Sequence, residues 1–410
     1  MKAIIILYLL TLPFKVFSRT LTVGRGGRYD NLNEAVQEAK DGDTVLIRKG
    51  IYQTSGVVVR KALTIIGEGF PELNGVAKTE ILIINGQKIF VSGIFFNNSG
   101  YSSINDIAAI KLVNSKNVII QGNKFAQTYF GIHVSNSSYF TIRNNQLTGR
   151  TRTEQTTGNG IHLWKCDHAL IEGNRINGHR DGIYFEFVTE SVIRNNTSFS
   201  NIRYGLHFMF SHNDSYTGNT FSKNGSGVAV MYSHNVDISN NVFDQNWGGA
   251  AYGILLKEIS DSKIEHNTFY KNTLALHLEG TTRITIQKNI FRENGWAVKV
   301  QASCSDNHFS NNNFLGNTFD IGTNGTMVLN QFEQNYWDKY EGYDINKDGI
   351  GDVPYHPVSM YSMIIEENPN AQILLRSFMV SLLDKAEKAI PSLTPENLVD
   401  TKPRMKPLRL

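Results

Sequence analysis

The stretch Gly205-Leu-His-Phe-Met-Phe-Ser-His-Asn-Asp-Ser-Tyr-Thr-Gly-Asn-Thr-Phe221 is followed by Gly227-Val-Ala-Val-Met-Tyr-Ser-His-Asn-Val-Asp-Ile-Ser-Asn-Asn-Val-Phe243. Both segments run from a glycine through an apolar–x–apolar triplet and a polar turn to the element Asn-x-Phe. Short runs of alternating apolar residues predict strands, and the Asn and Gly positions predict turns. Two such segments at a fixed, short spacing indicate a repeat architecture.

The Asn-x-Phe element extends in both directions from this stretch. With degenerate third positions it begins at Asn123, Asn145, Asn174, Asn196, Asn219, Asn241, Asn267 and Asn289, and Phe314 is its last aromatic position. A period of about 22 residues, with two insertions, predicts an all-β, right-handed parallel β-helix whose coils stack about 4.8 Å apart. The equivalent asparagines should then form an inward ladder between neighbouring turns.

Composition agrees with this fold. The 410 residues include 42 asparagines and 35 glycines, and no proline lies between Pro71 and Pro354. Because proline cannot donate to a strand ladder, this gap favours continuous strands and argues against a helical bundle. The 40% apolar content argues against disorder. A net charge of +3 gives no support to a nucleic-acid partner.

The chain divides into six predicted segments. Residues 1–18 have the features of a signal peptide, with an uncleaved anchor as the alternative, so the body should lie outside the cytoplasm. Residues 19–54 should form an N-terminal cap with an amphipathic helix over Tyr29–Lys40, and residues 55–340 the β-helix. An Asp/Asn-rich loop (341–369), an amphipathic helix (370–390) and a flexible tail (391–410) should follow. The helix either caps the last coil or docks on a partner or a membrane surface.

Aligning the coils on their glycines predicts which side chains face outward. Met209 and Met231 should stack on adjacent coils with His207 on the same face, and His212 should align with His234. Thioether and imidazole groups are ligands that suit Cu(I), so these five residues are the candidate copper ligands. The alternative is that the methionines belong to a protein-contact surface.

Further outward aromatic and apolar residues are candidates for partner binding. Trp164 and Tyr184 flank the methionine pair, and an insertion before the next coil carries Trp247 and Tyr252. The predicted C-terminal helix contributes Leu375, Phe378, Met379 and Leu382.

Two other features of the sequence lead to structural expectations that can be tested. Cys166 and Cys304 fall six coils apart, on the order of 29 Å, so they should remain unpaired thiols. Asp344, Asn346, Asp348 and Asp352 alternate as in the first half of a calcium loop, but Tyr355 stands where such a loop has Glu. A structural Ca²⁺ site and a metal-free Asp/Asn-rich turn both remain open.

Three stretches carry a family resemblance: Asp181–Phe187, Arg203–His212, and Asn335–Asp338 with the segment Tyr343–Pro357 that follows it. The coils resemble the carbohydrate-binding and sugar-hydrolase (CASH) repeats, and the chain more closely resembles the NosD family. This resemblance implies a periplasmic, non-catalytic β-helix seated on a membrane permease, NosY, that is driven by a cytoplasmic ATPase, NosF. It implies receipt of Cu(I) from the lipoprotein NosL and delivery to apo nitrous oxide reductase, NosZ. The copper ligands named above come from the outward-face reasoning and are not carried over from the family.

The rival hypothesis is an enzyme of the same fold, such as a polysaccharide lyase or uronan epimerase. Such enzymes need acids, bases and cations clustered on an exposed face. The predicted outward columns contain Glu186, with Arg180 and Asp181 at the preceding turn, but no stacked pair of outward carboxylates.

Overall fold

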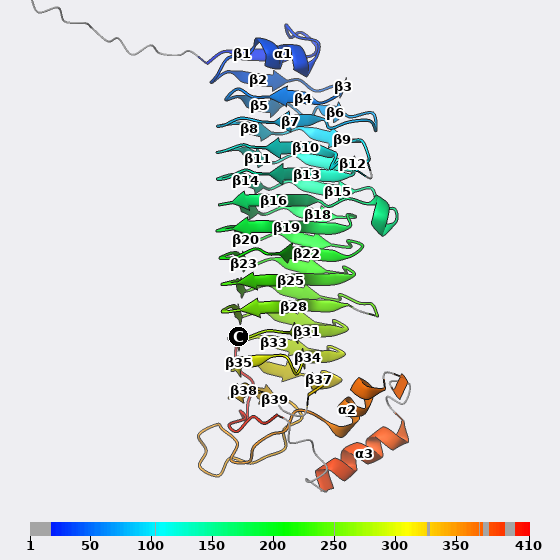
Figure 1. Ribbon diagram of the computed structural model, residues 1–410, viewed down its shortest axis with the longest axis vertical. Helices are drawn as coiled ribbons and strands as arrows, with labels where there is room; N and C mark the ends of the chain where they lie inside the picture. Colours follow the sequence, from blue (N-terminus) through cyan, green and yellow to red (C-terminus); the bar gives the residue numbers. More distant parts are fainter. Residues whose placement is uncertain are drawn as a thin grey trace, which may run out of the picture.

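The computed structural model describes residues 18–102, 104–249, 251–325, 329–368, 370–371, 377–389 and 398–410. They form a three-sided solenoid of parallel strands, in which each strand pairs with its equivalent on the next coil (Figure 1). The predicted parallel β-helix is therefore confirmed. In the described part of the chain, no helix is both long enough and apolar enough to span a bilayer. The predicted signal peptide lies, except for Ser18, outside the described residues.

The three sides of the solenoid are three sheets. The 14-stranded sheet contains β1 (Thr20–Val23), β2 (Thr44–Ile47), β5 (Thr64–Gly67), β8 (Phe90–Ser92), β11 (Ile119–Gln121), β14 (Thr141–Arg143), β17 (Leu170–Glu172), β20 (Val192–Arg194), β23 (Ser215–Thr217), β26 (Asp237–Ser239), β29 (Lys263–Glu265), β32 (Thr285–Gln287), β35 (Ser305–Ser310) and β38 (Leu329–Glu333). The 12-stranded sheet contains β4 (Val57–Val59), β7 (Leu82–Ile84), β10 (Ala108–Val113), β13 (Phe130–Ser135), β16 (Ile161–Asp167), β19 (Asp181–Thr189), β22 (Tyr204–Met209), β25 (Ser226–His234), β28 (Tyr252–Ser260), β31 (Leu274–Glu279), β34 (Trp296–Val300) and β37 (Phe319–Thr323). The 13-stranded sheet contains β3 (Ile51–Gln53), β6 (Glu72–Asn74), β9 (Phe95–Asn97), β12 (Lys124–Thr128), β15 (Gln146–Gly149), β18 (Arg175–Asn177), β21 (Thr197–Phe199), β24 (Thr220–Ser222), β27 (Val242–Asp244), β30 (Thr268–Tyr270), β33 (Ile290–Arg292), β36 (Asn313–Leu315) and β39 (Tyr336–Trp337).

The Asn-x-Phe repeat builds the interior of the solenoid. Its aromatic rings stack from coil to coil, with ring centroids 4.0 to 5.5 Å apart, in the order Phe221, Phe243, Phe269, Phe291, Phe314, Trp337. All six side chains are buried. Stacked aromatic pairs add to the stabilisation from apolar burial, so the repeat fixes both the core and the stacking of the coils.

The asparagines of the repeat form a continuous ladder beside this core. In chain order its members are Asn123, Asn145, Asn174, Asn196, Asn219, Asn241, Asn267, Asn289, Asn312 and Asn335. Asn219 is typical: Nδ2 donates to Ile193 O and Asn241 Oδ1, and Oδ1 accepts from N and Nδ2 of Asn196. At Asn219 both donors and both lone pairs of the amide are thus used, which explains why asparagine repeats at this position.

A second buried ladder was not predicted. It connects Asn201, Asn224, Asn246, Asn272, Asn294 and Asn317 at another corner of the coils. His179 lies at its first position, where its backbone N donates to Asn201 Oδ1 and its side chain is fully buried. Burial lowers the pKa of His179 to about 4, so its ring is neutral near pH 7.

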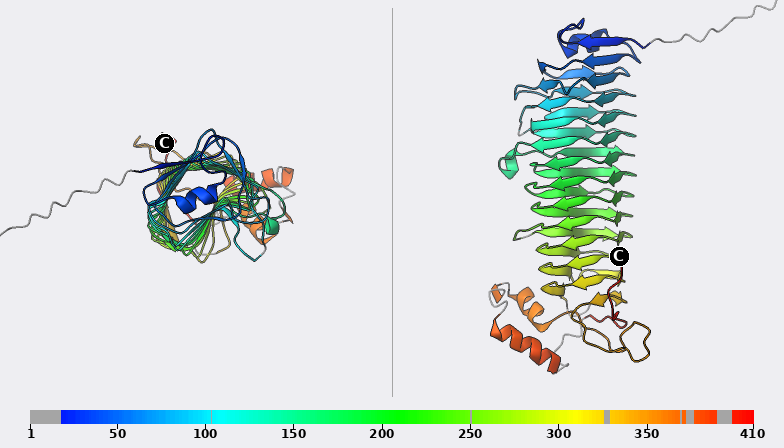
Figure 2. Two further views of the ribbon diagram at one scale, coloured as in Figure 1. Left: turned by 90° about the horizontal axis from the view of Figure 1, so that it is seen from above. Right: turned by 180° about the vertical axis from the view of Figure 1, so that it is seen from behind.

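The two ends of the solenoid are covered by different segments of the chain. At the first coil, α1 (Leu32–Glu38) buries Leu32, Ala35 and Val36, as predicted (Figure 2, left). At the last coil, Asp400 accepts hydrogen bonds from the backbone N and Nδ2 of Asn335 and from Nε1 of Trp337. The prediction of a flexible tail is therefore wrong for residues 398–410, while residues 391–397 lie outside the described part.

Of the two C-terminal helices, the first packs on the 12-stranded sheet, and the second packs against the first near the end of the solenoid opposite α1 (Figure 1). Residues 341–369 were predicted as a loop, but they contain α2 (Met360–Glu367), and α3 spans Phe378–Ala389. Tyr361, Ile365 and Val380 pack against Leu274, Trp296 and Phe319, which lie on the outer face of the 12-stranded sheet. Glu366 of α2 also pairs with Lys299 of the same face.

We expect Asn219→Ala to lower the free energy of unfolding by about 3 kcal/mol or more, because it removes four buried hydrogen bonds and leaves Asn196 N and Ile193 O without this partner, at about 1–3 kcal/mol for each buried polar group left unpaired. Urea denaturation followed by circular dichroism measures this change. Asn33→Ala, at an exposed position of α1, is the control and should be neutral. Equal stability of the two variants would contradict the structural role of the ladder.

The buried carboxyl group of Asp214 should make the stability of the protein depend on pH. Burial raises its pKa to about 8, although Ser191 N donates to Oδ1 at 2.8 Å. The folded chain therefore holds this proton at pH values where the unfolded carboxyl, of pKa about 3.9, has lost it. The contribution of Asp214 to the free energy of unfolding is therefore greatest below pH ~4 and decreases as the pH rises to ~8.

We therefore expect Asp214→Asn to exceed the wild type in free energy of unfolding at pH 8 by about 1 kcal/mol or more, with a smaller difference at pH 5. Urea denaturation at the two pH values checks this. Asp306→Asn, at an exposed position of β35, should show no such pH-dependent gain. A gain of equal size at both pH values would rule out titration of Asp214 as the cause.

Candidate metal and contact surface

The outer face of the 12-stranded sheet carries the predicted outward columns. The paired strands align Tyr184 with His207 and Ala229, and they align Glu186 with Met209, Met231 and Lys257. The predicted register is therefore confirmed. The two methionines are direct neighbours on β22 and β25, and both are half-buried.

His212 and His234 form a second pair, seven residues after the coil glycines. Their rings are parallel, with centroids 4.0 Å apart and an interplanar angle of 11°. His234 N donates to Nδ1 of His212 at 3.3 Å, so Nε2 is the nitrogen of His212 that could bind a metal. Partial burial and the neighbouring imidazole lower the pKa of His212, which favours the neutral, metal-binding form.

An exposed aromatic corner separates the two pairs. Phe187, Phe210 and Tyr232 follow Glu186, Met209 and Met231, and their rings stack at 5.3 and 5.0 Å. Each ring is between 38% and 44% exposed, and each residue has a φ between 50° and 55°. On other coils the same left-handed corner holds Asn136, Lys165, Glu258 or Gly280. The three stacked and exposed rings form a continuous aromatic surface that follows the methionine pair in sequence.

Sequence reasoning missed this corner, which we call the aromatic corner (Phe187, Phe210 and Tyr232). The signal was present, because all three residues stand five positions after their coil glycines. Strict outward–inward alternation assigns that position to the inner face, whereas the left-handed backbone there breaks the alternation and leaves the ring exposed.

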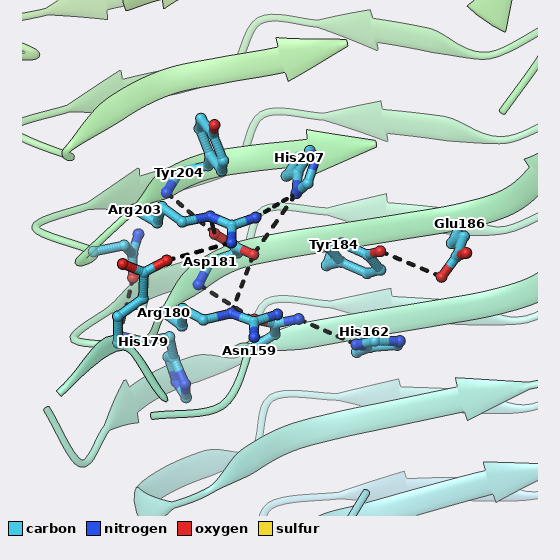
Figure 3. A network of polar contacts seen from close by, with 12 residues as sticks. Asn159, His162, His179, Arg180, Asp181, Tyr184, Glu186, Arg203, Tyr204 and His207 are labelled. Atoms are coloured by element: carbon cyan, nitrogen blue, oxygen red, sulfur yellow. Dashed lines mark hydrogen bonds and ion pairs between the residues drawn. The ribbon is translucent and has the colours of Figure 1, made fainter. Parts of the chain in front are cut away.

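His207 lies on the predicted face but is covered. Its side chain is 6% exposed and lies beside Asp181, whose carboxylate is fully buried between Arg180 and Arg203 (Figure 3). Nη2 of Arg203 lies 3.0 Å from Nδ1 of His207. Because a guanidinium only donates, Nδ1 accepts and the proton of a neutral ring sits on Nε2. In this tautomer neither nitrogen is available to a metal, so the expectation of an exposed ligand at His207 is wrong.

The same column continues away from the methionines as a covered ladder of rings. His133, His162 and Tyr184 follow one another at centroid distances of 4.8 and 4.7 Å. Burial lowers the pKa of His162 to about 3, and burial beside Glu186 raises the pKa of Tyr184 to about 12. Tyr184 donates its hydroxyl to Glu186 Oε2 and is only 9% exposed (Figure 3). It therefore supports Glu186 and offers little contact surface of its own.

The other predicted contact residues differ in exposure. Trp164 is half-buried beneath Lys165, and Trp247 of the insertion loop is 59% exposed. Tyr252 is half-buried and packs on His277. On α3, the exposed fractions are 82% for Phe378, 56% for Met379 and 49% for Leu382, whereas Leu375 lies outside the described residues.

The remaining predictions concern cysteines and calcium. Cys166 and Cys304 are both free and buried, as predicted. In the loop from Asp344 to Asp352, the side-chain oxygens of Asp344, Asn346, Asp348 and Asp352 accept hydrogen bonds from the loop's own backbone amides. Within the described residues, no group of three or more His, Cys, Asp or Glu side chains is placed to hold a metal ion. The calcium prediction therefore has no structural support.

Comparisons with solved structures identify the fold. An exopolygalacturonase of family 28 from Yersinia enterocolitica aligns with a TM-score of 0.54 at 9% identity, covering 78% of this chain and 79% of that one. The catalytic unit of an α-1,3-glucanase from Streptomyces thermodiastaticus aligns with a TM-score of 0.61 at 14% identity, covering 75% and 65%. At such identities the likeness shows a shared β-helix and does not transfer the glycan chemistry.

Comparisons of sequence identify the family. A curated protein of Pseudomonas aeruginosa, named "Probable ABC transporter binding protein NosD", is 28% identical over 372 residues, or 85% of each chain. The family described as "Periplasmic copper-binding protein (NosD)" matches residues 144–348, which is half of the chain and includes both methionines, both surface histidines and the aromatic corner. The chain belongs to the NosD family.

Proposed function

We propose that this protein is a non-catalytic periplasmic subunit of an ABC-transporter complex that carries Cu(I) transiently during assembly of nitrous oxide reductase. The observation that carries the proposal is the repeated element Met-aromatic-Ser-His, at Met209–His212 and Met231–His234, on two adjacent coils. It is supported by the family, whose description names copper and the periplasm.

The side chains of the two Met-aromatic-Ser-His elements suit a protein that carries copper transiently. Thioethers and neutral imidazoles are soft or borderline ligands that favour Cu(I) over hard cations. Met209 and Met231 would provide the thioethers, and His212 and His234 a neighbouring imidazole pair across the aromatic corner. Half-buried ligands on a rigid sheet remain accessible to a donor and an acceptor, and a site with few ligands releases the ion more readily than a closed four-ligand site.

The partners follow from the relatives' names and from the exposed surfaces. The P. aeruginosa relative is named as an ABC transporter binding protein, so we propose the permease NosY and the ATPase NosF as the transporter. The exposed apolar residues of α3 would dock on NosY. The aromatic corner beside the methionines would contact the copper donor NosL and the acceptor NosZ in turn, since exposed aromatic residues are typical of contact surfaces.

An enzymatic function is not favoured by the same face. Asp181 is fully buried and already faces two guanidinium groups, and Glu186 accepts a hydrogen bond from Tyr184. Glycoside-cleaving sites need two carboxyl groups that both reach the substrate.

We expect Met209→Leu/Met231→Leu to weaken Cu(I) binding by about tenfold or more, because leucine keeps the apolar volume but removes the sulfur; tenfold corresponds to about 1.4 kcal/mol. Anaerobic titration against a Cu(I) chelator measures the affinity. Met379→Leu, on α3, and His207→Gln, in the covered network, should leave the affinity unchanged. If the double variant binds Cu(I) as tightly as the wild type, the methionines are only a contact surface.

We expect Phe210→Asn/Tyr232→Asn to slow copper transfer from Cu(I)-loaded NosL while changing stability by no more than about 1 kcal/mol. Asparagine relieves roughly 1 kcal/mol of left-handed strain, and the lost stacking costs about 0.5–1.5 kcal/mol. Tyr139→Asn is the matched control, because Tyr139 is also exposed, stacked and left-handed but lies on another corner. Equal transfer rates in the double variant and the control would contradict a contact role for the aromatic corner.

A further inference from the structure

Two arginines meet a buried carboxylate at the corner of the solenoid where the strands of the 12-stranded sheet begin. Arg180 directly precedes β19 and Arg203 directly precedes β22, and Arg203 N donates to Arg180 O, so the two residues occupy the same position on adjacent coils. Their Nε atoms lie 3.5 and 3.4 Å from the two carboxylate oxygens of Asp181 (Figure 3). These contacts occupy one edge of each guanidinium and leave its Nη nitrogens for other partners.

The outer nitrogen of Arg203 already faces a carboxylate from another segment. Nη2 of Arg203 lies 3.0 Å from Nδ1 of His207, whereas Nη1 lies 3.4 Å from Oε1 of Glu154. Glu154 begins the 3₁₀ helix η1 (Glu154–Thr156), which belongs to a Thr-rich insertion and projects from the edge of the solenoid (Figure 1). The side chains of Arg203 and Glu154 are 33% and 47% exposed. A glutamate side chain on a short turn is therefore a group that fits this position.

Arg180 has donors that the protein does not use. Among the described residues, none provides a hydrogen-bond acceptor to either Nη nitrogen of Arg180, and the side chain is 31% exposed. Asp181, which is fully buried, keeps the guanidinium in place through Nε. A guanidinium that is already positioned loses less conformational entropy when it binds a carboxylate, and such charge-assisted hydrogen bonds are strong.

The surroundings of the two arginines are basic. Residues 149–158, 178–181, 200–204 and 223–226, which we call the arginine corner, contain five basic residues and only two acidic ones, Glu154 and Asp181. The equivalent segments of the coils on either side, residues 127–131 and 245–252, add no charge. The arginine corner therefore carries a net positive charge.

Aromatic side chains lie along the same edge of the solenoid. Arg203 lies over the ring of Tyr204, 4.8 Å from its centroid. Trp247 follows Asn246, which lies two coils beyond Asn201 in the second asparagine ladder, and it is 59% exposed. Arginine, tyrosine and tryptophan are the residues that most often dominate the binding energy of protein–protein interfaces. The combination of charge and residue type thus fits a protein partner with acidic side chains.

We propose that the arginine corner binds an acidic segment of a protein partner, whose carboxylates contact Arg180 and take the place of Glu154 on Arg203. The glutamate that occupies this place in the isolated chain is the main reason for choosing a protein carboxylate as the ligand. Arg203 precedes Met209 by six residues, on the order of 20 Å along an extended strand, so the corner is separate from the candidate copper ligands. The proposal goes beyond the copper function and does not depend on it.

The first test is the fluorescence anisotropy of a dye-labelled hexaglutamate peptide, with hexaglutamine as the uncharged comparison. We expect the wild type to bind only hexaglutamate, with an affinity that falls as salt rises. Glu154→Gln should bind it about two- to fivefold more tightly, because it removes the competing carboxylate of an exposed ion pair. Glu38→Gln, at an exposed position of α1, removes the same charge elsewhere and should leave the affinity unchanged.

The second test removes the donors. Arg180→Gln should weaken hexaglutamate binding by about fivefold or more, whereas Lys263→Gln, at an exposed position of β29 on the 14-stranded sheet, should bind normally. Thermal unfolding shows whether Arg180→Gln is folded. Should it not be, Arg180→Lys keeps a positive charge beside Asp181 but lacks the planar fork of donors, and it should also bind hexaglutamate more weakly.

Several outcomes would overturn the proposal. These are equal binding of hexaglutamate and hexaglutamine, equal affinity of Glu154→Gln and the wild type, and equal binding by Arg180→Gln and Lys263→Gln. Tighter binding of an oligogalacturonate than of hexaglutamate would assign the corner to an acidic glycan instead. The Cu(I) titration of Arg180→Gln should match that of the wild type, which separates a failure of this proposal from a failure of the copper function.

Discussion

The hydrogen bonding of one buried amide to the next coil is the constraint on which the rest of this structure depends. Each asparagine of the first ladder binds the backbone and side chain of the preceding coil and the carbonyl of a strand. Ladder partners are 22, 23, 26 or 29 residues apart, so an insertion in a coil must leave the solenoid as a loop before the next asparagine is reached. These interior hydrogen bonds therefore determine which residues of neighbouring coils lie side by side on the outer face.

That alignment explains how candidate ligands come together on the outer face of the 12-stranded sheet. A residue type repeated in two coils becomes a pair of neighbours, as for Met209 with Met231 and for His212 with His234. The left-handed corner between them carries the exposed rings. A solenoid can therefore place candidate ligands and a contact surface side by side on its outer face, while the buried core residues remain unchanged.

Much of this arrangement was predictable from the sequence because it depends only on spacing. The fold, the methionine pair, the histidine pair and the separation of the cysteines all follow from the repeat. The burial of His207 does not, because it depends on Arg203 and Asp181 at the start of their strands and on side chains from neighbouring coils. The ordered structure of residues 398–410 could not be predicted either, because the hydrogen bond between Asp400 and Asn335 joins residues 65 positions apart and has no counterpart in the repeat.

The place of Asp400 in the ladder sets an order of events for the newly made chain. Every inner asparagine finds its partner about one coil later in the sequence, so the coils can close one after another as the chain emerges. Asn335 and Trp337 instead wait for Asp400, which follows them by 65 and 63 residues. The last coil is therefore completed only after the segment that leads to Asp400 has been made, so a chain cut short before Asp400 leaves the last amide of the ladder without its acceptor.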